Sequence, residues 1–424
     1  MITLKSKDLS ISVQTGKLGE VTEVCIDRNG SKPFKYPIVG DSNPEGPKDA
    51  PSEFERKEVR KVYIDLLKKK FNDIENLVIL SGAGSSVGIG KNQIGLTMRQ
   101  LWDTLNKEKP EALKELIKET DYPESENDLE ILLSKAFLRL KADKPALKGS
   151  IDLVKQFIVD KCTLNQKPDN SPHYSFLEKV TLRPQKFPRV KIFTLNYDTL
   201  FEQAAAFGKF TVMDGFSFSS PREFNGKYFD YDLIETRHNR QDKHDSIIPK
   251  LFYLLKMHGS LNWKTEDEGI TILQDDSATI DIEKRVMVFP QNSKYENSFE
   301  QPYFEMMTRF QEVLRKPSTL LITIGFSFID KHISSVILES LKHNPALNLM
   351  AFTFPEVIIG GQQFQNEIFN RAHADSRVIL IAEKFEDLAR EYPDNLGQKR
   401  HDLLEELNDL LRAKQASDAK GKQA

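Results

Sequence analysis

Short apolar runs alternate with helix-like segments along most of the chain. The runs occur at residues 77–80, 190–194, 319–325, 347–354 and 377–382. Short apolar strands that alternate with helices and are flanked by glycine are typical of a parallel sheet covered on both faces. The pattern therefore predicts an α/β fold built on a Rossmann-like parallel sheet.

Two other segments have helical periodicity. Apolar residues recur at helical spacing between residues 52 and 71, directly before the first strand. Amphipathic text such as EALKELIKE and DLEILLSKAFLRL fills most of residues 95–180. We therefore expect a helical insertion at about 91–185, in the position of a lid.

The two ends of the chain differ from its centre. Residues 1–50 contain the alternating stretches LSISVQTG and EVTEVCID, which predict a small N-terminal appendage with a short β-hairpin. Residues 51–400 hold the strands and form the predicted main domain. Residues 401–424 are expected to be the end of a C-terminal helix and a disordered tail, because the last twelve residues are polar.

Composition excludes several classes of protein. The net charge of -3 gives no reason to expect nucleic acid or an anionic membrane as a direct partner, although it leaves room for a local basic patch, and nucleic acid is expected only indirectly. No run approaches the ~20 apolar residues of a membrane helix, and we expect a cytoplasmic protein. Cys25 and Cys162 are too few for a four-cysteine zinc site, so no metal is expected.

The first apolar strand leads into the glycine-rich turn LSGAGSSVGIG, residues 80–90. The dinucleotide fingerprint requires glycine where Val87 stands, and the Walker pattern requires glycine where Ser85 stands. Small residues still let backbone N–H groups approach a pyrophosphate. A purely structural turn is an equally good reading. The candidate nucleotide-binding residues are Gly82, Ala83, Gly84 and Ser85.

Three further polar stretches follow apolar runs, where the ligand crevice of a parallel sheet lies. In TLNYDTL, Asn196 can both donate and accept hydrogen bonds, whereas Asp198 could simply cap the next helix. In LKMHGSLNW, His258 is either a structural histidine or a proton acceptor, and Gly259 favours close approach of a ligand.

The last stretch, LLITIGFSFIDKHI, contains Gly325 and Ser327 after a strand. Asp330 stands at a predicted helix start, so an ordinary turn with an N-cap is the alternative interpretation. Taken singly, each of the four stretches is ambiguous.

Together, and in this order, GAGSS, TLNYD, HGS and GFSF resemble the catalytic core of the sirtuin (Sir2) family. The resemblance is closer to its bacterial branch, which is associated with phage defence, and spans roughly residues 77–388. It implies a catalytic asparagine at Asn196, a general base at His258 and a residue near the nicotinamide carboxamide at Asp198. It also implies that the opening turn, Gly325 and Ser327 contact NAD.

The sequence departs from the sirtuin deacylases in two respects. Their zinc ribbon cannot be built here, and VGIGKNQIG stands where their GIPDFR-type loop would be. The resemblance therefore implies hydrolysis of NAD, as substrate, to nicotinamide and ADP-ribose. The alternatives are an NAD-dependent protein deacylase or ADP-ribosyltransferase, and a non-catalytic sensor of NAD or ADP-ribose.

The resemblance also implies how the activity is controlled. Members of the defence branch act with other components, so we expect a homo-oligomer and a protein partner such as a HerA-like hexameric ATPase. An enzyme that destroys cytoplasmic NAD has to be gated to spare its host.

Overall fold

The computed structural model describes thirteen stretches of the chain, residues 2–5, 9–15, 21–28, 34–37, 74–123, 126–141, 147–184, 187–235, 246–266, 271–276, 280–289, 301–353 and 363–393. The helix expected at 52–71 and the tail expected at 401–424 lie outside the described residues.

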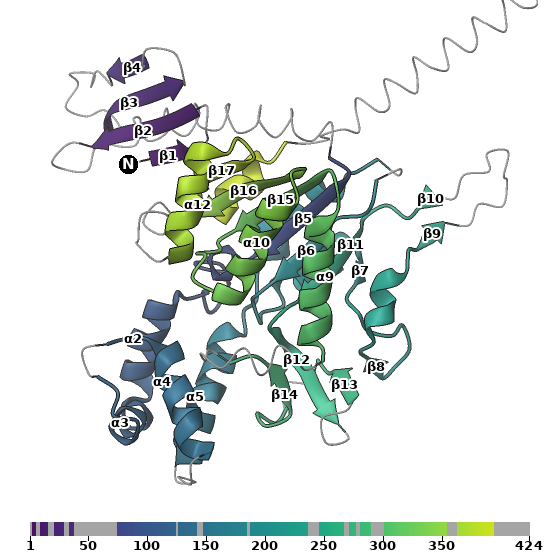
Figure 1. Cartoon of the computed structure of the whole chain (residues 1–424). Coiled ribbons are helices and arrows are strands. Elements are labelled where there is room, and N and C mark those ends of the chain that lie inside the picture. The colour runs from purple at the N-terminus through teal and green to yellow at the C-terminus, as the bar shows by residue number, and fades with distance from the viewer. Residues whose placement is uncertain are drawn as a thin grey trace, which may run out of the picture.

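Seven parallel strands form the centre of the main sheet (Figure 1). Their spatial order is β17-β16-β15-β5-β6-β11-β7, and every neighbouring pair among them is parallel. The strands are β5 (Asn76–Ser81), β6 (Lys191–Thr194), β7 (Thr211–Met213), β11 (Leu251–Lys256), β15 (Thr319–Ile324), β16 (Leu347–Thr353) and β17 (Val378–Ala382). The predicted α/β fold with a parallel sheet is confirmed.

Alternating side chains of these strands enter two hydrophobic cores, one on each face of the sheet. From β5, Leu77 and Ile79 pack with α6 (Pro172–Val180), α7 (Leu200–Gly208) and α13 (Phe385–Glu391). Val78 and Leu80 pack on the other face with α9 (Tyr303–Arg315), α10 (Lys331–His343) and α12 (Gln363–Ala374). The result is a three-layer arrangement, as parallel sheets require.

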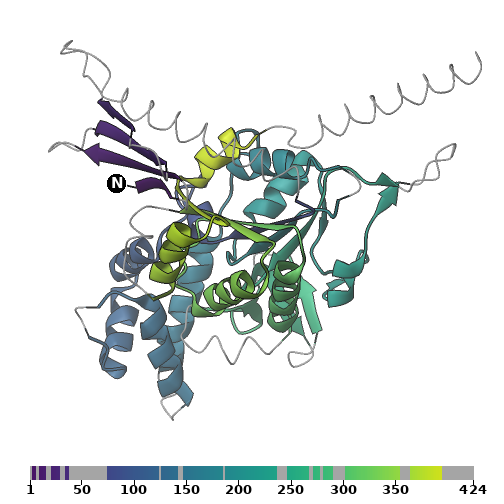
Figure 2. The same ribbon diagram turned by 45° about the horizontal axis from the view of Figure 1, so that its top comes forward.

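Four N-terminal strands continue the sheet beyond β17 (Figure 2). They are β1 (Ile2–Lys5), β2 (Leu9–Thr15), β3 (Val21–Arg28) and β4 (Phe34–Pro37). All pair antiparallel, and β1 joins the sheet by pairing with β17. Where the sequence predicted a short hairpin, the structure has four strands that extend the main sheet.

Four helices after the opening turn share a separate hydrophobic core. They are α2 (Met98–Glu108), α3 (Pro110–Glu119), α4 (Leu129–Lys141) and α5 (Leu147–Cys162). Figure 1 shows them together at one end of the molecule. Their core also includes Leu261, Met287 and Phe289, so the helical insertion packs against the segments that surround β12 and β14. Although α6 lies in the same helix-rich stretch, it covers the main sheet instead.

Short antiparallel strands complete the fold. A four-stranded sheet has the order β14-β12-β13-β8, from β8 (Arg222–Glu223), β12 (Gly259–Glu266), β13 (Thr271–Gln274) and β14 (Arg285–Met287). A second pair joins β9 (Ile234–Glu235) and β10 (Ser246–Ile247). These short strands were not predicted from the sequence. Among the described helices, none combines the length and apolar character that crossing a bilayer requires.

His173 of α6 is a titratable residue in the apolar core. It is 0% exposed and lies edge-on to the rings of Phe201 and Phe385, with ring centroids 4.7 and 4.9 Å away. Neither ring nitrogen has a hydrogen-bond partner among the described residues. Burial lowers the pKa of His173 from 6.5 to about 3, so the folded protein holds a neutral imidazole.

We expect the substitution His173→Leu to remove one source of acid sensitivity. The unfolded chain protonates His173 below its ordinary pKa of 6.5, whereas the folded chain does so only near 3. The stability due to this difference is therefore complete above pH 6.5 and is lost as the pH falls. Between pH 7 and pH 5 the wild type should lose about 2 kcal/mol more free energy of unfolding than the variant, as measured by urea denaturation. Equal losses would contradict a neutral buried His173.

Candidate functional site

The four polar stretches leave the sheet at one edge because their strands end in register. Neighbouring strands β15, β5, β6 and β11 are aligned so that Ile324 pairs with Ser81, Ser81 with Thr194, and Thr194 with Lys256. Each strand ends at this level and is followed directly by one of the stretches. Ligands of open parallel sheets bind at this carboxyl edge.

The opening turn and the turn at Gly325 pack backbone to backbone. The N–H of Gly84 donates to the carbonyl oxygen of Gly325 at 3.0 Å. A Cβ atom on Gly82 would lie 2.7 Å from the Gly325 carbonyl oxygen, and one on Gly84 would lie 2.6 Å from the Gly325 Cα. Gly325 itself has φ +59°, a conformation that favours glycine. Glycine at these positions is what allows the two turns to touch.

We expect Gly84→Ala to lower the free energy of unfolding by about 1–3 kcal/mol, because the added methyl group forces the two backbones apart. Gly149→Ala is the matched control. Gly149 lies in α5 with nothing within 4 Å of an added Cβ, so alanine there should be neutral or stabilise by up to about 1 kcal/mol. Urea denaturation measures both. A Gly84→Ala protein as stable as the control would mean that the two turns do not pack as described.

Most hydrogen-bonding groups of the opening turn are already used within the protein. The N–H groups of Gly82, Gly84, Ser85 and Ser86 donate to backbone carbonyls. The Ser85 side chain is 0% exposed and bonds to Ser81 Oγ and the Gly82 carbonyl. The turn leads into a single 3-10 turn, Ala83–Ser85, and the next α-helix begins only at Met98. Among the four candidate nucleotide-binding residues, Ala83 is the exposed one, and nucleotide binding here stays a prediction.

Asn196 ties the opening turn to the end of β6. Its Nδ2 donates towards the Gly82 carbonyl oxygen at 3.0 Å, Ser85 Oγ at 3.0 Å and Ser86 Oγ at 2.8 Å. A carbonyl oxygen only accepts, so the Gly82 contact fixes which end of the amide faces the turn. Oδ1 of Asn196 forms no hydrogen bond with any described residue, and the side chain is partly exposed. The amide therefore keeps one acceptor for a ligand.

Asp198 is buried and uses both carboxylate oxygens. Oδ1 accepts from the N–H of Leu200 at the start of α7, at 3.1 Å, which realises the helix-capping interpretation. Oδ2 accepts from the hydroxyl of Ser86 at 2.6 Å. Sequence reasoning missed Ser86, although it is the second serine of GAGSS. It links Asn196 to Asp198.

An ion pair of a buried lysine and a partly exposed glutamate joins the end of β11 to α7. Lys256, the last residue of β11, is 2% exposed, and its Nζ donates to Glu202 Oε1 of α7 at 2.8 Å. The same Nζ donates to the carbonyl oxygens of Tyr197 and Asp198. Burial raises the pKa of Glu202, and the charge of Lys256 opposes that rise. Lys256 thereby holds the segment that follows Asn196.

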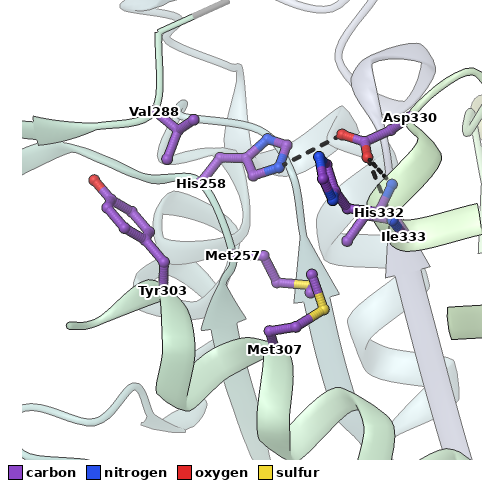
Figure 3. A pocket seen from close by; sticks show the side chains of 8 residues that line it. All are labelled: Met257, His258, Val288, Tyr303, Met307, Asp330, His332 and Ile333. Carbon is purple, nitrogen blue, oxygen red and sulfur yellow. Dashed lines mark hydrogen bonds and ion pairs between the residues drawn. The ribbon is translucent and has the colours of Figure 1, made fainter. Parts of the chain in front are cut away.

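His258 lies in the wall of a hollow (Figure 3). Its backbone turns sharply into β12 at Gly259, which has φ +80°, and its carbonyl accepts from the N–H of Val288 at 2.9 Å. The hollow is lined by Met257, His258, Val288, Tyr303, Met307, Asp330, His332 and Ile333. It is largely apolar, with His258, Tyr303, Asp330 and His332 as its titratable groups.

Asp330 has two contacts that the sequence predicted only in part. As expected for an N-cap, its Oδ1 accepts from the N–H groups of His332 and Ile333 at 3.0 and 3.3 Å. Its Oδ2 lies 3.8 Å from Nε2 of His258 (Figure 3). Ser327 lies on the same turn and is partly exposed, and its carbonyl accepts from Gln365 at 2.8 Å.

The described residues were expected to hold no metal, and their potential ligands are scattered. Within the described ranges, no three or more His, Cys, Asp or Glu side chains are grouped so that they could hold a metal ion. Cys162 is half-buried, and desolvation together with the nearby charge of Asp198 raises the pKa of its thiol to about 12. The side chain of Cys25 lies outside the described part of the chain. Cys162 is therefore an inert, protonated thiol.

Residues 190–381 match a family described as the SIR2-like domain. The match runs from the residue before β6 into β17, so this part of the chain is sirtuin-like. It includes Asn196, Asp198, His258, Gly325 and Ser327, and it does not reach the opening turn. No curated protein matches the chain.

Two solved structures of Sir2 proteins align with most of the chain. One, described as the structural basis for the mechanism and regulation of Sir2 enzymes, is 14% identical and covers 79% of this chain and 96% of its own, with a TM-score of 0.37. The other, a Sir2 variant with a deacetylated p53 peptide and 3′-O-acetyl ADP-ribose, is 12% identical and covers 78% and 96%, with a TM-score of 0.33.

Proposed function

We propose that this protein is an NAD hydrolase that cleaves NAD to nicotinamide and ADP-ribose and serves as a gated effector in anti-phage defence. The observation that carries the proposal is the register of β15, β5, β6 and β11, which brings Gly325, Gly82, Asn196 and His258 to one edge of the sheet. The SIR2-like match over four of the five strand-end residues Asn196, Asp198, His258, Gly325 and Gly82 adds support.

The proposed reaction needs no strong general acid in the site. The C–N bond between ribose and nicotinamide breaks, nicotinamide leaves as a neutral ring, and the ribose carbon becomes oxocarbenium-like. A water oxygen then bonds to that carbon and loses a proton. His258 accepts this proton, because a neutral imidazole is a good base near neutral pH. Asn196 Oδ1 accepts a hydrogen bond from the water or from a ribose hydroxyl, and so orients the reacting groups.

A direct test is to incubate the purified full chain with NAD and to measure nicotinamide, ADP-ribose and NAD binding. Release of both products without any acceptor supports the hydrolase. Binding without release supports the sensor of NAD or ADP-ribose. Neither binding nor release, with the partner protein present or absent, would overturn the proposal.

A protein deacylase is the second candidate, because the hollow beside His258 is lined largely by Met257, Val288, Met307 and Ile333. Such a lining suits an acyl chain. The same assay with an acetyl-lysine peptide separates the two activities. Nicotinamide release that depends on the peptide, with loss of its acetyl group, favours the deacylase, and transfer of ADP-ribose to the peptide favours a transferase.

The proposal includes an assembly. We place the enzyme in the cytoplasm as a homo-oligomer with a HerA-like hexameric ATPase as its partner, which keeps basal NAD cleavage low. The N-terminal strands β1–β4 are a candidate contact surface, because they project beyond β17 (Figure 2). Mass measurement of the co-purified complex tests this assembly, and an isolated monomer with full activity would contradict it.

A further inference from the structure

The backbone of His258 is fixed by the strands on either side of it. The N–H of Met257 donates to the carbonyl of Thr194 at 2.9 Å, and the carbonyl of His258 accepts from Val288 at 2.9 Å. Gly259 follows in a conformation that only glycine adopts easily, and a Cβ there would lie 2.1 Å from the carbonyl oxygen of Val286.

Asp330 faces that ring from another element. Its Oδ2 is 3.8 Å from Nε2 of His258, and the two side chains are only 10% and 14% exposed. Charges that are largely removed from water interact more strongly than exposed ones. Among the described residues that line the hollow, the other titratable groups are Tyr303 of α9 and His332 of α10, and Asp330 supplies the carboxylate.

The helix does not need the charge of Asp330. Asparagine and serine cap helices about as well as aspartate, because capping requires only an oxygen that accepts from the first N–H groups. Here Oδ1 alone caps α10, through the N–H groups of His332 and Ile333. The second oxygen does not take part in this cap, and it faces Nε2 of His258 (Figure 3).

We infer that Asp330 is a positioning residue for His258, which holds the imidazole ring in place and stabilises its protonated form while its other oxygen caps α10. This role rests on the proposed function in that His258 is the general base. Because the carboxylate faces Nε2, the proton lost by the attacking water is accepted at Nδ1, and the negative charge of Asp330 stabilises the imidazolium that results. This role would make the N-terminus of α10, where Asp330 stands, part of the group of residues that accepts the proton.

The test compares Asp330→Asn with Asp128→Asn in the full chain. Asp128 caps α4 in the same manner, with Oδ1 accepting from the N–H groups of Glu130 and Ile131, and it stands within the helical insertion. Both variants keep an asparagine cap and lose one charge. Asp330→Ser, also a good cap, replaces Asp330→Asn if that variant does not fold.

Asp330→Asn should lower kcat and kcat/KM for NAD by the same factor, with KM unchanged, because the contact strengthens in the transition state. Loss of the carboxylate lowers the pKa of His258, so the acid limb of the kcat/KM profile should move to lower pH by about 1 unit. Asp128→Asn should leave rate and profile as in the wild type. If the pH profile of kcat/KM were the same in Asp330→Asn as in the wild type, Asp330 would only cap the helix.

A second readout does not depend on catalysis. Histidine-labelled full chain, with the His258 signal assigned from a His258→Gln variant, reports the pKa of His258 by NMR titration. A fall in that pKa in Asp330→Asn, but not in Asp128→Asn, supports the positioning role even if the wild type releases no nicotinamide, an outcome that would overturn only the proposed function. An unchanged pKa overturns the inference about Asp330.

Discussion

Replacing His258 by alanine in the full chain should lower the rate of nicotinamide release from NAD by about a hundredfold or more, the scale expected for loss of a general base. The imidazole lies at the carboxyl edge of the sheet, in the wall of a partly closed hollow. Alanine leaves the turn into β12 intact, because that turn depends on Gly259 and on backbone hydrogen bonds. The loss should therefore be one of chemistry, with the fold retained.

Asn196→Ala should cause a loss of similar size, because it removes the amide that orients the reacting groups and ties the opening turn to β6. His343→Ala is the control. His343 stands at the exposed end of α10, where its side chain is 79% exposed, and its removal should leave the rate unchanged. Product release is followed by chromatography, and folding by circular dichroism. A folded His258→Ala or Asn196→Ala protein with full activity would remove that residue from the proposed mechanism.

Lys256→Met should lower the free energy of unfolding by about 3 kcal/mol, the low end of the range for breaking a buried ion pair from one side, because the Glu202 side chain is 25% exposed. Methionine fills the space of the lysine stem but leaves the carboxylate of Glu202 and the carbonyls of Tyr197 and Asp198 without their cation. Urea denaturation at neutral pH measures the loss. The double variant Lys256→Met, Glu202→Met should recover part of it, because the stranded carboxylate is gone.

The matched control makes the same change in an exposed ion pair. Lys342 contacts Glu339 at 2.7 Å on the surface of α10, where the side chains are 46% and 56% exposed. Lys342→Met should cost less than about 1 kcal/mol, because water screens such pairs. If Lys256→Met were equally mild, Lys256 would not hold the segment after Asn196, and the coupling between the two strand-end loops would have to reside elsewhere.

The sequence predicted the main sheet because the buried strands are short, apolar and separated by helices. Runs such as TLLITIG and RVILIA became β15 and β17 with shifts of one residue at their ends. The common edge of the candidate site followed from the same logic, since parallel strands deliver their carboxyl ends to one side. The small antiparallel sheet was not predicted, because three of its four strands have only two to four residues and carry too little alternation to be recognised.

Contacts between distant segments could not be predicted from the sequence. Asp330 reads as a helix cap, and nothing in its local text indicates that its second oxygen faces His258. Lys256 reads as a break in an apolar run, whereas the fold buries it beside Glu202. Both depend on how α7, α10 and β11 are placed relative to one another, which is a property of the packed structure.

The backbone contact between the opening turn and the turn at Gly325 has a thermodynamic consequence. Their shape is held by hydrogen bonds within the protein and by the Asn196 amide, so it exists before any ligand arrives. A nucleotide that binds beside Ala83 would meet a surface that has already lost its conformational freedom, and little of the binding energy would be consumed in ordering it. The same rigidity limits how far the turns can adjust to a ligand. A ligand that accepted hydrogen bonds from the N–H groups of Gly84 or Ser85 would first have to break the bonds that these groups donate to backbone carbonyls.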